Sequence, residues 1–105
     1  MVIKQHEIWM VSLGHDAMGH EQNGDRPFYV ISNTDYNASS QTPIGFFMST
    51  SKKKASNRFA VDVINGTVNV SQIRTLSSKR FLRFMDVDVK ATTQVALESF
   101  IKNIL

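Results

Sequence analysis

The chain ends in the stretch Leu97-Glu98-Ser99-Phe100-Ile101-Lys102-Asn103-Ile104-Leu105, whose apolar residues recur at helical spacing. Those residues fall at i, i+3, i+4, i+7 and i+8, which places them in one stripe along a helix. Glu98 and Lys102 stand four positions apart, in the order that favours an ion pair on a helix surface. The spacing therefore predicts a helix from about Lys90 to Asn103.

Upstream of this helix lie short segments rich in β-branched and aromatic residues, which is strand composition. They are Glu7–Leu13, Phe28–Ile31, about Thr42–Thr50, Phe59–Ile64, Thr67–Ser71 and Phe81–Val87. The dipeptide Asn65-Gly66 predicts a hairpin with a type I′ turn, in which both central residues need a positive φ. Strands followed by a helix predict a mainly β fold: a small curved sheet or barrel of five to seven strands, covered by a C-terminal helix.

The connections between these segments differ in character. Gly14–Asp25 is a long polar loop, and irregular loops of this length are usually functional or disordered. Pro27 favours an extended conformation for Arg26. Asn33–Ser40 is dense in turn-forming residues and is predicted to be a turn region. Ser51–Arg58 is predicted to be a basic loop.

Composition limits the classes of protein that fit. The 105 residues contain no cysteine, which excludes disulfides, thiolate zinc sites and cysteine nucleophiles. We expect a single domain over residues 1–105. No apolar run approaches the roughly 18 residues of a membrane helix, and the N-terminus lacks a signal-peptide pattern, so a cytoplasmic location is expected.

Charge is distributed unequally along the chain. Residues 1–50 hold two Lys/Arg and five Asp/Glu, a net charge of −3, whereas residues 51–105 hold ten and four, a net charge of +6. Such asymmetry indicates either a surface that faces a polyanion or a solvated basic face without a partner.

The long loop holds the residues most suited to chemistry. His20, Glu21 and Arg26 lie within seven positions and offer a general base, a hydrogen-bond partner and a phosphate-stabilising guanidinium. A structural alternative is an ion pair between Glu21 and Arg26 that holds the loop. The three histidines have no metal-ligand spacing, so no metal site is expected.

Three stretches resemble a known family: His6–Leu13, then Gly19-His20-Glu21-Gln22-Asn23-Gly24-Asp25-Arg26-Pro27 with Val30–Asn33, and later Ser71-Gln72-Ile73-Arg74-Thr75-Leu76. In order and distance they resemble the two signatures of the MazF/PemK toxins, over essentially the whole chain. The resemblance implies an SH3-like barrel with a C-terminal helix, a homodimer, and a cognate antitoxin through which alone operator DNA is contacted. It implies an endoribonuclease that needs no metal or cofactor and cuts single-stranded RNA by 2′-OH attack, leaving 2′,3′-cyclic phosphate and 5′-OH ends.

The resemblance also assigns residues. Arg26 matches the catalytic arginine of the family, and Ser49, followed by Thr50, stands where the family has a catalytic threonine. Serine keeps the hydroxyl donor. His20 and Glu21 match loop residues that assist catalysis or bind RNA in different members.

Two positions depart from the family pattern. Ser71 replaces an acidic residue, and Asn69 replaces an arginine that some relatives use. These losses move the expected catalysis onto Arg26 with Ser49 or Thr50. They also keep an alternative open: a non-catalytic binding protein of the same fold, or a topoisomerase poison like the CcdB-like toxins. Arg74 is expected to tie the sheet or the dimer together.

RNA binding is expected from basic and polar residues around these positions: Lys52, Lys53, Lys54 and Arg58, a second cluster of Lys79, Arg80 and Arg83, and Gln22 in the long loop. For the second cluster a solvated face is an equal alternative. Tyr36 is the candidate for base stacking, whereas Trp9 and Phe46 are expected in the core.

Overall fold

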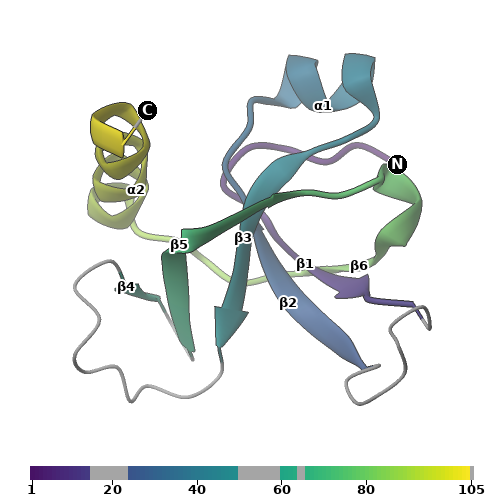
Figure 1. The fold of residues 1–105 in the computed structure, drawn as a ribbon, viewed down its shortest axis with the longest axis horizontal. Coiled ribbons are helices and arrows are strands. Elements are labelled where there is room, and N and C mark those ends of the chain that lie inside the picture. The colour runs from purple at the N-terminus through teal and green to yellow at the C-terminus, as the bar shows by residue number, and fades with distance from the viewer. Residues whose placement is uncertain (15–23, 50–59, 64–65, 105) are drawn as a thin grey trace.

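The computed structural model describes residues 1–14, 24–49, 60–63 and 66–104. Strands are the commonest elements among these residues, and a longer helix follows them near the end of the chain (Figure 1). The strands are β1 (Ile8–Ser12), β2 (Asp25–Val30), β3 (Ile44–Ser49), β4 (Ala60–Val63), β5 (Gly66–Thr75) and β6 (Phe81–Met85). The helices are α1 (Thr34–Ser40), a 3-10 turn η1 (Ser78–Arg80) and α2 (Ala91–Ile104). None of them is long and apolar enough to cross a membrane.

The strands form one antiparallel sheet in the order β4-β5-β3-β2-β1-β6. Within the described residues β4 and β6 are its two edges, so the expected barrel is an open, curved sheet. Curvature comes from an irregularity in β5, because Phe46 pairs with Ile73 while Met48 pairs with Val68. Extra residues on one strand bend it and increase its twist. β5 therefore changes direction between the part that pairs with Met48 and the part that pairs with Phe46, and both parts remain antiparallel to β3.

Successive side chains of a strand point to opposite faces of the sheet, and apolar residues therefore form a separate cluster on each face. The helix-side cluster consists of Ile8, Tyr29, Ile31, Phe46, Met48, Val63, Val68, Val70 and Leu97. The opposite cluster consists of Ile3, Trp9, Val11, Phe28, Val30, Phe47 and Phe81. Trp9 and Phe46 are buried, as the sequence predicted.

Helix α2 begins and ends within a residue of its predicted bounds and packs its apolar stripe against the helix-side cluster. Its Glu98 does not pair with Lys102 as expected. Instead the Oε2 atom of Glu98 lies 2.6 Å from Nε2 of His6, and Nδ1 of His6 is hydrogen-bonded to the hydroxyl of Tyr29. Donation from Nε2 to the carboxylate leaves Nδ1 of a neutral imidazole as the acceptor for the tyrosine hydroxyl. His6 adopts a left-handed φ of 70° at this position.

The prediction of a turn region over Asn33–Ser40 is wrong, because these residues form α1. Asn33 caps the helix, and its side chain accepts a hydrogen bond of 2.8 Å from the backbone N–H of Tyr36. Asn37 is buried and donates to the carbonyl of Ile3 at 2.9 Å. Capping and this tertiary contact stabilise a short helix that the composition alone did not reveal.

The predicted hairpin is confirmed in its pairing but not in its turn residues. Strands β4 and β5 pair antiparallel, and Val63 lies opposite Gly66. Gly66 is therefore a strand residue, without the positive φ expected of it, whereas Asn65 lies outside the described residues. Glycine is needed here for close packing, because a Cβ atom would lie 2.5 Å from the carbonyl oxygen of Ser49.

Candidate functional site

Arg26 is the second residue of β2 and lies on the face of the sheet opposite α2. Its Nη2 atom donates to the carbonyl oxygen of Met48 at 3.2 Å, and its Cζ atom lies 4.7 Å from the ring centroid of Phe47. Phe47 is in turn held edge-on against Phe28, with 5.3 Å between ring centroids. A hydrogen bond and a cation–π contact thus fix a half-buried guanidinium in position.

Ser49 is the last residue of β3 and is exposed. The carbonyl that Arg26 contacts belongs to the peptide bond directly before it. The β2–β3 register points the same way: the pairing ends at Phe28 and Phe47, and its continuation by two residues along both strands would place Arg26 opposite Ser49. The structure therefore brings together the two residues that the sequence placed at the centre of the site.

Arg74 approaches the same ring from the other side of β3. It lies on β5 opposite Gly45, and its Cζ atom lies 6.0 Å from the ring centroid of Phe47. Gly45 allows the strands to pack closely here, since a Cβ atom would lie 2.0 Å from the carbonyl oxygen of Tyr29. The sequence assigned Arg74 to the sheet or dimer and missed this proximity, which depends on the pairing of Arg74 with Gly45, two residues before Phe47 on β3.

The two guanidinium groups affect each other electrostatically. Burial, and then the charge of Arg74, lower the pKa of Arg26 from its usual value. Arginine still keeps its charge in proteins, so the pair holds two positive charges beside one aromatic ring. Among the described residues neither arginine forms an ion pair with a carboxylate. Forked N–H donors beside a hydroxyl are suited to a phosphate group.

Comparison with known proteins settles the family. A model of the PemK-like, MazF-like toxins of type II toxin–antitoxin systems matches residues 4–105. The chain belongs to this family. No curated protein matches it.

Solved structures of MazF proteins have the same fold. A chain of the MazE–MazF crystal structure (Form-II) from Deinococcus radiodurans is 20% identical, with a TM-score of 0.81, and the match covers 99% of this chain and 96% of that one. An endoribonuclease of a mycobacterial species, in complex with its cognate antitoxin, is 17% identical, with a TM-score of 0.73 and coverage of 97% and 91%. At these identities the likeness confirms the mainly β fold with its C-terminal helix.

Asn69 and Ser71, the two departures from the MazF/PemK pattern, contact each other. The Oδ1 atom of Asn69 accepts from the backbone N–H of Ser71 at 3.1 Å and from its hydroxyl at 2.7 Å. This neutral pair lies in β5 between the residues that pair with Met48 and with Phe46, where the strand bends. In this MazF-like chain these two positions support the bend and carry no charge.

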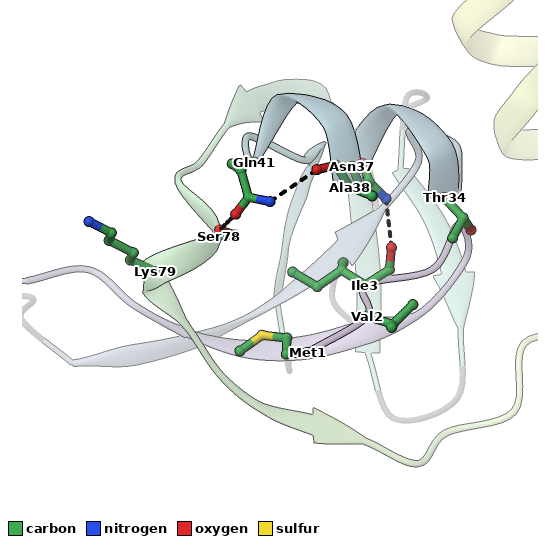
Figure 2. Close-up of a pocket in the computed structure, with 9 residues that line it drawn as sticks. All are labelled: Met1, Val2, Ile3, Thr34, Asn37, Ala38, Gln41, Ser78 and Lys79. Carbon is green, nitrogen blue, oxygen red and sulfur yellow. Dashed lines mark hydrogen bonds between the residues drawn. The ribbon is translucent and has the colours of Figure 1, made fainter.

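The remaining described candidates lie elsewhere on the toxin. Tyr36 is 40% exposed but lies on α1. This helix follows the C-terminal end of β2, whereas Arg26 lies near the N-terminal end of that strand (Figure 1). Arg80 donates to the carbonyl of Ser12 at 3.1 Å and so anchors η1 to the end of β1. Lys79 extends outward at the edge of a pocket of about 280 Å³ between α1, η1 and the N-terminal residues (Figure 2).

Hydrogen bonds between residues that line this pocket join the end of α1 to η1. Gln41 accepts from Ser78 at 3.0 Å and donates to the carbonyl of Ala38 at 3.0 Å, as Figure 2 shows. The structure therefore does not bring Tyr36 or Lys79 to Arg26.

Other predicted site residues lie outside the described residues: His20, Glu21, Gln22, Thr50, Lys52, Lys53, Lys54 and Arg58. Within the described part, no group of three or more His, Asp or Glu side chains is placed to bind a metal ion.

Proposed function

We propose that this toxin is a metal-independent, sequence-specific endoribonuclease that cleaves single-stranded RNA, mRNA included. The observation that supports this most directly is the guanidinium of Arg26, fixed on the Phe47 ring beside the peptide that leads into Ser49. A rigid, permanently charged donor next to a hydroxyl suits a reaction in which charge builds up on phosphate oxygens.

The reaction balances as an internal transfer. The ribose 2′-oxygen bonds to the neighbouring phosphorus as its proton passes to a base, and the bond from phosphorus to the 5′-oxygen breaks as that oxygen takes up a proton. The products are a 2′,3′-cyclic phosphate and a 5′-OH. N–H groups of Arg26 donate to the phosphorane oxygens, and the Ser49 hydroxyl adds a donor, with Thr50 beside it. His20 or Glu21 of the long loop supplies the base.

The proposed setting follows the family. The toxin acts in the cytoplasm as a homodimer and is neutralised by a cognate antitoxin. The similar structures from Deinococcus radiodurans and from a mycobacterial species are complexes of this kind. The basic residues that the sequence assigned to RNA contacts contribute to binding by their charge: Lys52, Lys53, Lys54, Arg58, Lys79 and Arg80.

The test is cleavage of a mixed-sequence RNA in EDTA, followed by mapping of the fragment ends. We expect cyclic-phosphate ends at preferred sites, and a loss of cleavage of about 100-fold or more in Arg26→Ala, as for the removal of a donor that stabilises a transition state. Lys102→Gln, an exposed cation on α2, is the control and should cleave normally. Intact RNA with the folded wild-type protein would contradict the proposal and favour the non-catalytic or topoisomerase-poisoning alternative.

A further inference from the structure

The described part of the chain holds a second cation at the proposed site that the catalytic scheme above does not use. Arg74 comes from β5, and Arg26 comes from β2, on the other side of β3. Their Cζ atoms lie 6.0 and 4.7 Å from the same ring centroid of Phe47, so the two guanidinium carbons are at most 10.7 Å apart. One strand of RNA that reaches Arg26 therefore passes within reach of Arg74.

The two arginines are held differently. Arg26 is half-buried and is tied to the carbonyl of Met48, so its position is fixed before any ligand arrives. Arg74 is exposed and lies at the outer limit of a cation–π contact. A fixed donor suits charge that develops during reaction, whereas an exposed cation suits a charge that the ligand already carries.

Their mutual repulsion is a cost that a phosphate would remove. Both guanidinium groups contact the Phe47 ring, and burial, then the charge of Arg74, lower the pKa of Arg26. An anion placed between or beside them would relieve this repulsion and gain two charge-assisted sets of hydrogen bonds.

We propose that Arg74 binds an RNA backbone phosphate equally in the ground state and the transition state, while Arg26 acts on the phosphorane. This inference rests on the proposed function for its substrate, single-stranded RNA. It assigns Arg74 a binding role and predicts that its loss changes KM and not kcat.

The experiment separates binding from cleavage. Binding to a fully 2′-O-methylated RNA, which lacks the attacking hydroxyl, is measured by fluorescence anisotropy between about 50 and 200 mM salt. Arg74→Gln should raise Kd about tenfold at low salt and reduce the slope of log K against log salt by about 0.7, the value for one phosphate on a single strand. Arg74→Lys should keep the slope, because it keeps the charge, and Lys102→Gln should match the wild type.

Cleavage kinetics complete the test. We expect Arg74→Gln to raise KM for unmodified RNA about tenfold with kcat within about twofold of the wild type. Unchanged Kd and slope in a folded Arg74→Gln protein would overturn the inference, and so would a fall in kcat with KM unchanged. If Arg74→Gln does not fold, Arg74→Lys decides: a slope reduced as if the charge were lost would overturn it. Binding without cleavage by the wild type would contradict the proposed function while the Arg74 measurement still stands.

Discussion

The two faces of the sheet are closed by different means. On one face α2 covers the helix-side cluster, and a polar chain of Glu98, His6 and Tyr29 ties the helix to the strands. On the other face the edge of the cluster at Phe47 is covered by two guanidinium groups. Both faces carry a cluster of apolar residues, so the difference between them lies in what covers each cluster. One face is built for stability, and the other leaves charge where a ligand can reach it.

The largest expected effect is on the helix-covered face. Phe46→Ala removes a ring that is fully buried in the helix-side cluster. It should lower the free energy of unfolding by about 3–5 kcal/mol, measured by urea denaturation followed by circular dichroism. Val95→Ala, at a side chain that is 65% exposed, is the control and should stay within about 0.5 kcal/mol of the wild type. Equal effects would mean that α2 does not protect this cluster.

A substitution on the other face should affect activity more than stability. Phe47→Leu keeps most of the buried volume, so the loss of stability should stay under about 1.5 kcal/mol. Arg26 loses its aromatic support, and kcat/KM for RNA cleavage should fall about tenfold. Phe81→Leu changes the same cluster at a ring that packs against Trp9 and Phe28, and its kcat/KM should fall clearly less. Equal falls would show that packing alone controls the site.

Tyr29→Phe tests the polar chain beneath α2. The change leaves Nδ1 of His6 without its partner and should cost about 1 kcal/mol at neutral pH. Burial, and then the charge of Glu98, raise the pKa of the Tyr29 hydroxyl. The folded state therefore holds this group neutral, while the unfolded chain ionises it from about pH 10.

The pH dependence follows from this raised pKa. The contribution of Tyr29 to stability is complete below about pH 10 and is lost as the pH rises further. Urea denaturation at about pH 8 and 10.5 should show a steeper fall for the wild type than for Tyr29→Phe. Parallel falls in both proteins would contradict the burial of this hydroxyl.

The smallest effect is expected at the outer end of the same chain. Glu98 is 51% exposed, and its hydrogen bond to Nε2 of His6 competes with water, so it contributes little to stability. Glu98→Gln should lower the free energy of unfolding by about 0.5 kcal/mol or less, and Lys102→Gln serves as the matched charge change. A loss of several kcal/mol would show that the pair behaves as a buried one.

Local patterns predicted most of the fold, because strand composition and helical spacing depend on near neighbours. They identified the C-terminal helix within a residue at each end. They failed for α1, whose stability comes from a cap at Asn33 and from a contact between Asn37 and Ile3, 34 residues apart. Gly66 was misplaced for a similar reason, since its role is to avoid the carbonyl of Ser49 on another strand.

For the candidate site, the sequence predicted residues but not their contacts. The family resemblance identified Arg26 and Ser49, and the structure adds the contacts that hold Arg26 beside the peptide before Ser49. The position of Arg74 was beyond the sequence, because it depends on the register between β3 and β5, two strands that do not follow each other in the chain. Tyr36 and Lys79 were suited to RNA binding by residue type. Residue type does not predict where in the fold a side chain lies, and these two lie on α1 and η1, away from Arg26.

The order of the strands also has a consequence for how the protein is made. β1 pairs with β6, so that Ile8 lies opposite Met85, 77 positions later in the chain. During synthesis β1, β2 and β3 leave the ribosome long before β6 exists, and one edge of β1 stays open until then. Pairing over such separations is slow compared with local contacts. The toxin therefore reaches its folded state only after β6 has been translated.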